Sequence, residues 1–253
     1  MADTATRSAG GASREWSDEE HELRVQLAAA YRLADKYGMS ELINTHISLR
    51  LPDAPHTYLF NPHGMLFDEI TASSLVTVDL RGNVTSHSEY TANRAGVAIH
   101  GAILGARPDV SCVFHTHTPW ATAVSSLECG LLPMSQAALR FEGQVAYHDY
   151  GRAATDPAEC DRLAEDIGDN SVMLLRNHGI LTTGRTVGEA FVSAYYLEKA
   201  CQFQILAQSA GVPLVMPTEE IRLAASGRTP GMEERAWPAL LRMLDRMDPS
   251  YRD

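Results

Sequence analysis

Two apolar segments of the chain each end in histidines, and this pair constrains the fold more than any other feature. The first reads CVFHTHTPW (residues 112–120) and the second reads SVMLLRNHG (residues 171–179). Short apolar runs followed by turn residues are typical of buried β-strands. Residues i and i+2 of a strand point to the same side, so His115 and His117 are predicted to face one way where the first strand ends. His178 lies just past the end of the second strand.

The rest of the chain alternates between helical and strand patterns without a break. Apolar residues at helical spacing run through 20–37, and a second long helix is expected at 187–210. THISLRL at 45–51 alternates in the manner of a strand. We therefore predict one α/β domain over residues 18–253. A small, polar, disordered tail is expected over residues 1–17.

Composition narrows the classes of partner. The 253 residues are 45% hydrophobic and 21% charged, with a formal net charge of -11. An acidic surface repels nucleic-acid phosphates and anionic lipid, so we expect neither nucleic acid nor membrane as a partner. The N-terminus has no apolar stretch of the kind that a secretory signal carries. The four cysteines form no CxxC pair, which favours reduced thiols in the cytoplasm.

The three histidines at the two strand ends suit a divalent metal ion. Neutral imidazoles bind zinc, manganese or iron, and a three-histidine set leaves positions open for water or substrate, as in catalytic sites. By spacing alone, an HxH pair is more often a pair of histidines that neighbouring groups satisfy than a metal site. The pattern therefore predicts a site for one divalent ion at His115, His117 and His178 without choosing the metal.

Several segments, in order, resemble the class II aldolase/adducin family from about residue 23 to residue 215. They are NTHISLRLP, FNPHGMLFDEITASSLVTVDL, NRAGVAIHGAILGARPDVSCVFHTHT, QVAYHDYG and MLLRNHGILTTGRTVGEAFVSAYYLEKACQ. The resemblance implies a three-layer α/β/α fold around a mostly antiparallel sheet, and a cyclic homotetramer with sites between subunits. It also implies that His115, His117 and His178 match the metal-binding histidines of the family's sugar-phosphate aldolases and epimerases.

The chain departs from those aldolases around the helix that precedes HxH. Their acidic acid/base residue stands four positions before a helix histidine, which here is His100, so the position falls on Gly96. Their phosphate-binding Ser-Ser pair reads Arg-Ala at 94–95, and a Gly-Asn pair of the same pocket reads Thr-His at 45–46. The sequence is therefore similar to an adducin-like branch that lacks the aldolase acid.

Six further residues are candidates for the chemistry of this altered site. Arg94 offers a fork of donors that suits a carboxylate, although a surface helix residue in a salt bridge fits the sequence as well. The predicted catalytic residues are Arg94, Glu142 and His148, and the predicted substrate-binding residues are His46, His63, Arg94 and His100. The alternatives are a core histidine at His100, a solvated loop glutamate at Glu142 and a hydrogen-bonded loop histidine at His148.

Three functions are compatible with these patterns. The favoured one is a metal-dependent lyase that acts on a small carboxylated or carbonyl substrate, by decarboxylation or aldol-type cleavage. Decarboxylation removes no hydroxyl proton, so it tolerates the glycine at position 96. A non-haem iron oxygenase on the same three histidines is the second, and a non-catalytic adducin-like assembly domain is the third.

Overall fold

The structure, a computed structural model, describes residues 16–151, 156–225 and 231–253. Residues 1–15 of the predicted tail therefore lie outside the described residues. Ser17, the last residue of that predicted tail, accepts a hydrogen bond from the backbone N–H of Glu20 and caps the first helix.

The helices follow the predicted order. Their bounds are α1 Asp18–Lys36, α2 Arg94–Ala106, α3 Pro119–Ser125, α4 Gln136–Leu139, α5 Pro157–Ile167, α6 Val187–Gln208, α7 Glu219–Ala225 and α8 Met232–Met247, with short 3-10 turns η1 Phe67–Glu69 and η2 Pro249–Arg252. Asn93 caps α2 by accepting from two backbone N–H groups of its first turn. Within the described ranges, no helix has the length and apolar character needed to cross a bilayer.

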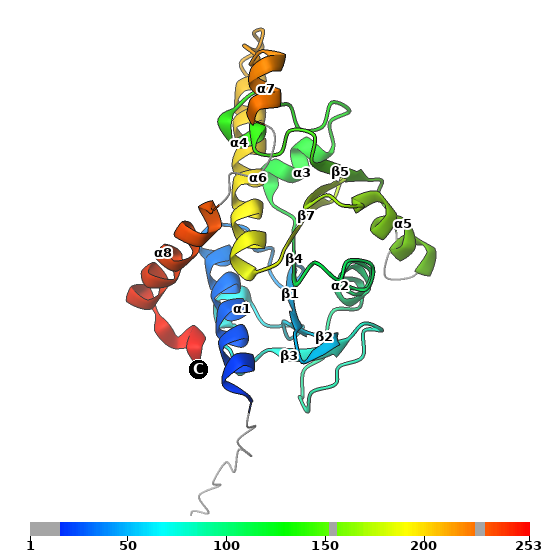
Figure 1. Cartoon of the computed structure of the whole chain (residues 1–253), viewed down its shortest axis with the longest axis vertical. Helices are drawn as coiled ribbons and strands as arrows, with labels where there is room; N and C mark the ends of the chain where they lie inside the picture. The colour runs from blue at the N-terminus through cyan, green and yellow to red at the C-terminus, as the bar shows by residue number, and fades with distance from the viewer. Residues whose placement is uncertain (1–15, 152–155, 226–230) are drawn as a thin grey trace, which may run out of the picture.

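A seven-stranded sheet forms the centre of the molecule, in the order β3-β2-β1-β4-β7-β6-β5 (Figure 1). The strands are β1 His46–Leu51, β2 Ala54–Phe60, β3 Val76–Asp79, β4 Cys112–Thr116, β5 Val145–His148, β6 Val172–Leu175 and β7 Gly179–Gly184. Only β5 and β6 pair in parallel, and every other neighbouring pair of strands in this sheet is antiparallel. The mostly antiparallel sheet is confirmed.

Helices cover both faces of the sheet. Alternate residues of β4 enter different cores, with Phe114 in the core that includes α1, α6 and α8, and Val113 in the core that includes α2 and α5. This alternation follows from the two-residue period of a strand. Figure 1 shows α1, α6 and α8 on one side of the sheet and α2 and α5 on the other. The α/β/α layering that the resemblance implied is therefore correct.

Strand register brings the histidines together at one end of the central strands of the sheet. In the centre of the sheet, β4 lies between β1 and β7. His46, at the start of β1, pairs directly with His115 near the end of β4. Thr116 pairs with Ile180 near the start of β7, and His178 immediately precedes that strand. The end of β4 thus meets the beginnings of both its neighbours.

Candidate metal centre

Three histidines converge where β4 ends and β7 begins. One nitrogen from each of His115, His117 and His178 lies within 4.8 Å of the others. The Nε2 atoms of His115 and His117 are 3.1 Å apart. The ring centroid of His178 is 4.9 Å from that of His115 and 4.6 Å from that of His117. The three predicted metal ligands therefore form one cluster.

The outer nitrogens of the HxH pair have fixed partners. His115 Nδ1 lies 2.7 Å from the Ile180 carbonyl oxygen, and His117 Nδ1 lies 2.7 Å from Glu41 Oε2. Both partners accept, so both Nδ1 atoms carry a proton, and in a neutral ring the Nε2 atom then presents a lone pair to the cluster. Glu41 was not predicted, because it is an exposed residue between α1 and β1 in a stretch without any motif.

The backbone before β7 places His178 against the HxH pair. Asn177 adopts a left-handed conformation with φ of 57°, which turns the chain sharply between β6 and β7. Gly179 follows, and a Cβ on it would collide with the carbonyl oxygen of Thr116. The close approach of β7 to β4 therefore requires glycine at this position. Thr122 Oγ1 also donates to the His178 carbonyl oxygen over 3.2 Å.

Burial keeps His115 and His178 neutral. Burial, with smaller contributions from neighbouring histidines, lowers the pKa of His115 well below its ordinary value. Burial and the nearby His117 lower the pKa of His178 to about 4. A neutral imidazole is the form that binds a metal. Converging lone pairs, neutral rings and fixed Nδ1 protons all fit a divalent ion held by three histidines.

His46 fills the space of the missing carboxylate. A Cβ built on Gly96 would lie 2.6 Å from His46 Nε2 and 2.5 Å from its Cδ2, so no larger residue fits at position 96 while His46 stands there. His46 is 3% exposed, and its ring centroid is 4.9 Å from that of His115. Behind it, His100 is fully buried. The structure therefore brings the predicted His46 and His100 beside the three-histidine cluster.

The remaining predicted residues occupy different places. Arg94 is exposed in the first turn of α2, two residues before Gly96, and pairs with no group in the described part of the chain. Glu142 lies 3.8 Å from Arg222 and lines a cavity of about 160 Å³ that has no histidine in its lining. His63 is exposed in the turn after β2.

His148 is held between two carboxylates. Its Nε2 lies 2.8 Å from Glu159 Oε1, and its Nδ1 lies 2.7 Å from Asp166 Oδ2. Arg162 also pairs with Glu159. Burial would raise the pKa of Glu159, but hydrogen bonds from His148 and Arg162 outweigh it and the pKa is lowered. We call His148, Glu159 and Asp166 the carboxylate clamp; it leaves neither nitrogen of His148 free for catalysis.

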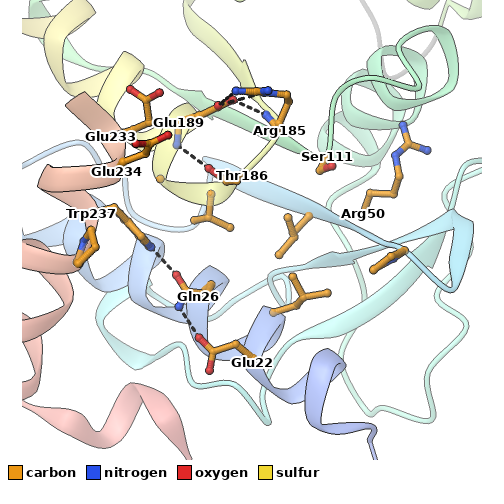
Figure 2. A pocket seen from close by; sticks show the side chains of 16 residues that line it. Glu22, Gln26, Arg50, Ser111, Arg185, Thr186, Glu189, Glu233, Glu234 and Trp237 are labelled. Carbon is orange, nitrogen blue, oxygen red and sulfur yellow. Dashed lines mark hydrogen bonds and ion pairs between the residues drawn. The ribbon is translucent and has the colours of Figure 1, made fainter. Parts of the chain in front are cut away.

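A cavity of about 770 Å³ lies at the other end of β1 and β4, away from the histidines. Figure 2 shows that Arg185 and Glu189 pair with each other, and that Trp237 donates to Gln26, which donates to Glu22. None of the predicted site residues lines this cavity. Its size therefore does not mark the chemistry, which lies where nitrogen lone pairs converge.

Comparison with known proteins agrees with the fold. Residues 25–205 match the family profile described as Class II Aldolase and Adducin N-terminal domain. An aldolase II superfamily protein from Pseudomonas syringae is 47% identical, with a TM-score of 0.90 over 94% of this chain and 98% of the other. L-fuculose 1-phosphate aldolase from Glaciozyma antarctica is 28% identical, with a TM-score of 0.84 over 95% and 96%.

Adducin is also among the relatives. Rat alpha-adducin is 39% identical over 94% of this chain, a match that covers 35% of its own length. The similarity thus extends both to proteins named as aldolases and to the N-terminal domain of a protein that is not. The chain belongs to the family of class II aldolases and adducin N-terminal domains.

Proposed function

We propose that the protein is a divalent-metal-dependent carbon–carbon lyase that acts on a small carboxylated or carbonyl substrate, by decarboxylation or aldol-type cleavage. The convergence of three imidazoles, with the Nε2 atoms of His115 and His117 3.1 Å apart, carries the proposal. The family membership supports aldolase-type lyase chemistry in general. The neutral His46 in place of an acid at position 96 favours decarboxylation within that class.

The chain's own residues prepare the site. His115, His117 and His178 would hold the ion, and the Ile180 carbonyl and Glu41 orient the two rings of the HxH pair. When bound, a divalent ion withdraws electrons from a carbonyl oxygen and so stabilises the carbanion that C–C cleavage leaves. Imidazole donors suit zinc, manganese and iron alike; we propose zinc or manganese for the lyase.

Arg94 is the proposed carboxylate contact. It stands in the first turn of α2, close in sequence to the glycine that packs on His46. Its guanidinium has no ion-pair partner among the described residues, so binding a substrate carboxylate breaks no existing pair. A planar fork of N–H donors matches the two oxygens of a carboxylate. Glu142 and His148 already have charged partners and are left out of this role.

The likeness to alpha-adducin favours a second candidate, a non-catalytic assembly domain. An assembly domain has no physical need for three imidazoles whose ring nitrogens face one another. Metal content and turnover separate the two functions. An iron-dependent oxygenase would use the same three histidines, and oxygen consumption would identify it.

We also propose that the protein is a homo-oligomer, a tetramer, in the cytoplasm. Figure 1 shows α7 and the C-terminal part of α6 extending beyond the sheet layer. Large apolar side chains are exposed there, among them Phe203, Leu206, Val215 and Ile221. Several exposed large apolar side chains in one part of a molecule are typical of subunit contacts. The described cysteines are free thiols, which suits a reducing compartment.

The test begins with the metal. Protein purified without chelator is analysed for elemental content and screened against hydroxy- and keto-acids for release of carbon dioxide or aldehyde. Near-stoichiometric zinc or manganese with release of either product is the expected result. Bound iron with oxygen consumption would replace the lyase by the oxygenase. Absence of metal after reconstitution, together with absence of turnover, would favour the assembly domain.

A further inference from the structure

A chain of three polar side chains runs from the metal centre into the core. His46 Nδ1 lies 2.9 Å from His100 Nε2, and His100 Nδ1 lies 2.5 Å from Ser48 Oγ. His46 is 3% exposed, while His100 and Ser48 are fully buried. An imidazole carries a proton on at least one of its two nitrogens, so a ring nitrogen that accepts a hydrogen bond leaves the proton on the other nitrogen.

The buried serine fixes the direction of this chain. The Ser48 hydroxyl has no other hydrogen-bond partner among the described residues, and a buried O–H that donates to nothing is costly. Ser48 therefore donates to His100 Nδ1. His100 must then carry its proton on Nε2 and donate to His46 Nδ1. His46 in turn carries its proton on Nε2.

The His46 Nε2–H is consequently a donor without an acceptor. Within the described part of the chain it makes no hydrogen bond, and it lies against Gly96 beside the ring of His115. His46 Nε2 is not one of the fully buried side-chain atoms that lack a hydrogen-bond partner in the described residues, so solvent or a ligand can reach it. A carboxylate at this place would accept a hydrogen bond from a substrate hydroxyl, whereas this nitrogen can only donate one.

We propose that His46 donates a hydrogen bond to an anionic oxygen of the substrate, so that the site selects small 2-hydroxy or 2-oxo acids over neutral diols. His100 and Ser48 act through His46 and are positioning residues. The proposal rests on the proposed metal-dependent function, because the substrate oxygen must lie beside the three histidines. It adds the substrate class that the His46–His100–Ser48 chain recognises.

A matched ligand pair tests the selection. Glycolate and ethane-1,2-diol differ by one carboxylate, and their dissociation constants are measured on cobalt-loaded protein by visible absorption. His46→Leu should weaken glycolate binding roughly tenfold or more, the usual worth of a hydrogen bond to a charged group, and leave diol binding and cobalt content unchanged. His56→Leu, an exposed histidine on β2, should change nothing.

Unchanged glycolate affinity in His46→Leu with full cobalt overturns the role of His46 and leaves the lyase proposal standing. Failure of the wild-type protein to bind metal overturns both. Should His46→Leu not fold, NMR of ¹⁵N-histidine-labelled wild-type protein decides, because His46 and His100 must both carry their proton on Nε2. The opposite tautomers overturn the proposal, and Ser48→Ala should reduce the population of the Nε2–H form at His46.

Discussion

The three-histidine cluster and the carboxylate clamp place the same side chain in opposite settings. Both lie where strands end, and His148 pairs in register with Leu175, three residues before His178. In the clamp, each ring nitrogen of His148 lies within hydrogen-bond distance of a carboxylate oxygen. In the cluster, His115 and His178 are neutral and the inner nitrogens face one another.

The difference shows what distinguishes a structural histidine from a candidate ligand. The clamp satisfies every nitrogen with protein groups and so joins β5 to α5. The cluster instead turns the Nε2 atoms of His115 and His117 toward each other, 3.1 Å apart, where they could bind an ion. Burial is similar in both places, since His148 is 5% exposed and His115 is 1% exposed. Burial therefore does not separate the two settings, whereas the partners of each nitrogen do.

The largest effect expected from breaking the cluster is loss of metal. His115→Ala removes one of three ligands and should lower metal affinity by more than about a hundredfold, which exceeds the 10- to 100-fold usual for an outer partner. Glu41→Gln, which alters only the partner of His117, should weaken affinity by roughly tenfold. Competitive titration with a chromophoric chelator measures both. Equal metal content in His115→Ala and wild type would contradict the assignment of the cluster.

A substitution in the carboxylate clamp should lower the stability of the protein and leave its metal content unchanged. His148→Leu leaves the buried Glu159 with only the exposed Arg162 as partner, and breaking a buried ion pair typically costs about 3 kcal/mol or more of unfolding free energy. Metal content should remain that of wild type. Urea denaturation followed by circular dichroism measures the free energy of unfolding, and elemental analysis measures the metal content. A variant that is as stable as wild type but has lost its metal would mean that His148 belongs to the metal centre and not to a structural clamp.

Acid should destabilise the metal-free protein through the cluster. The pKa of His178 is about 4 in the folded chain and 6.5 ordinarily, so the unfolded chain takes up the proton first as the pH falls. The contribution of such a histidine to the free energy of unfolding is therefore fully present above pH 6.5. It is lost as the pH falls toward 4, by about 1.4 kcal/mol per pH unit for each such histidine. Urea midpoints between pH 7.5 and 4.5 measure the slope. The free energy of unfolding of His178→Asn should decline less steeply as the pH falls. A slope identical to that of wild type would mean that a group other than His178 takes up the proton.

The sequence could predict the cluster because local rules determine it. The two-residue period of a strand fixes the relation of His115 to His117, and the apolar run before His178 marks a second strand end. The two long helices also follow from local signals, because helical spacing of apolar residues predicts 20–37 and 187–210, close to α1 and α6. The resemblance supplied what periodicity does not, namely that the two strand ends meet.

Long-range contacts account for what could not be predicted. Glu41 reaches His117 across 76 positions of sequence, and no motif marks it. The carboxylate clamp joins His148 to residues of α5 whose spacing from it has no meaning until the helix packs on the sheet. The sequence revealed the absence of an acid at Gly96, but only the packing of β1 against α2 shows that His46 fills its space.

Two glycines of α2, Gly96 and Gly105, test whether His46 fills the space beside position 96. Replacing each with alanine is expected to change stability less than any substitution above. A Cβ at position 96 would meet the His46 ring at 2.5–2.6 Å, whereas a Cβ at position 105 has nothing within 4 Å. Alanine in a helix is favoured over glycine by up to about 1 kcal/mol, so Gly105→Ala should stabilise the protein. Gly96→Ala gains the same propensity but overpacks a ring that His100 holds, which usually costs about 1–3 kcal/mol.

The two substitutions should therefore shift the urea midpoint in opposite directions. Both substitutions replace glycine with alanine in the same helix, so both gain the same helix propensity. The difference between their urea midpoints therefore measures how firmly His46 occupies the space over Gly96. Adding His46→Ala to Gly96→Ala should abolish the clash and make the two glycine positions equivalent. Equal shifts for Gly96→Ala and Gly105→Ala in the wild-type background would mean that the His46 ring yields freely, and the carboxylate position would then be open rather than filled.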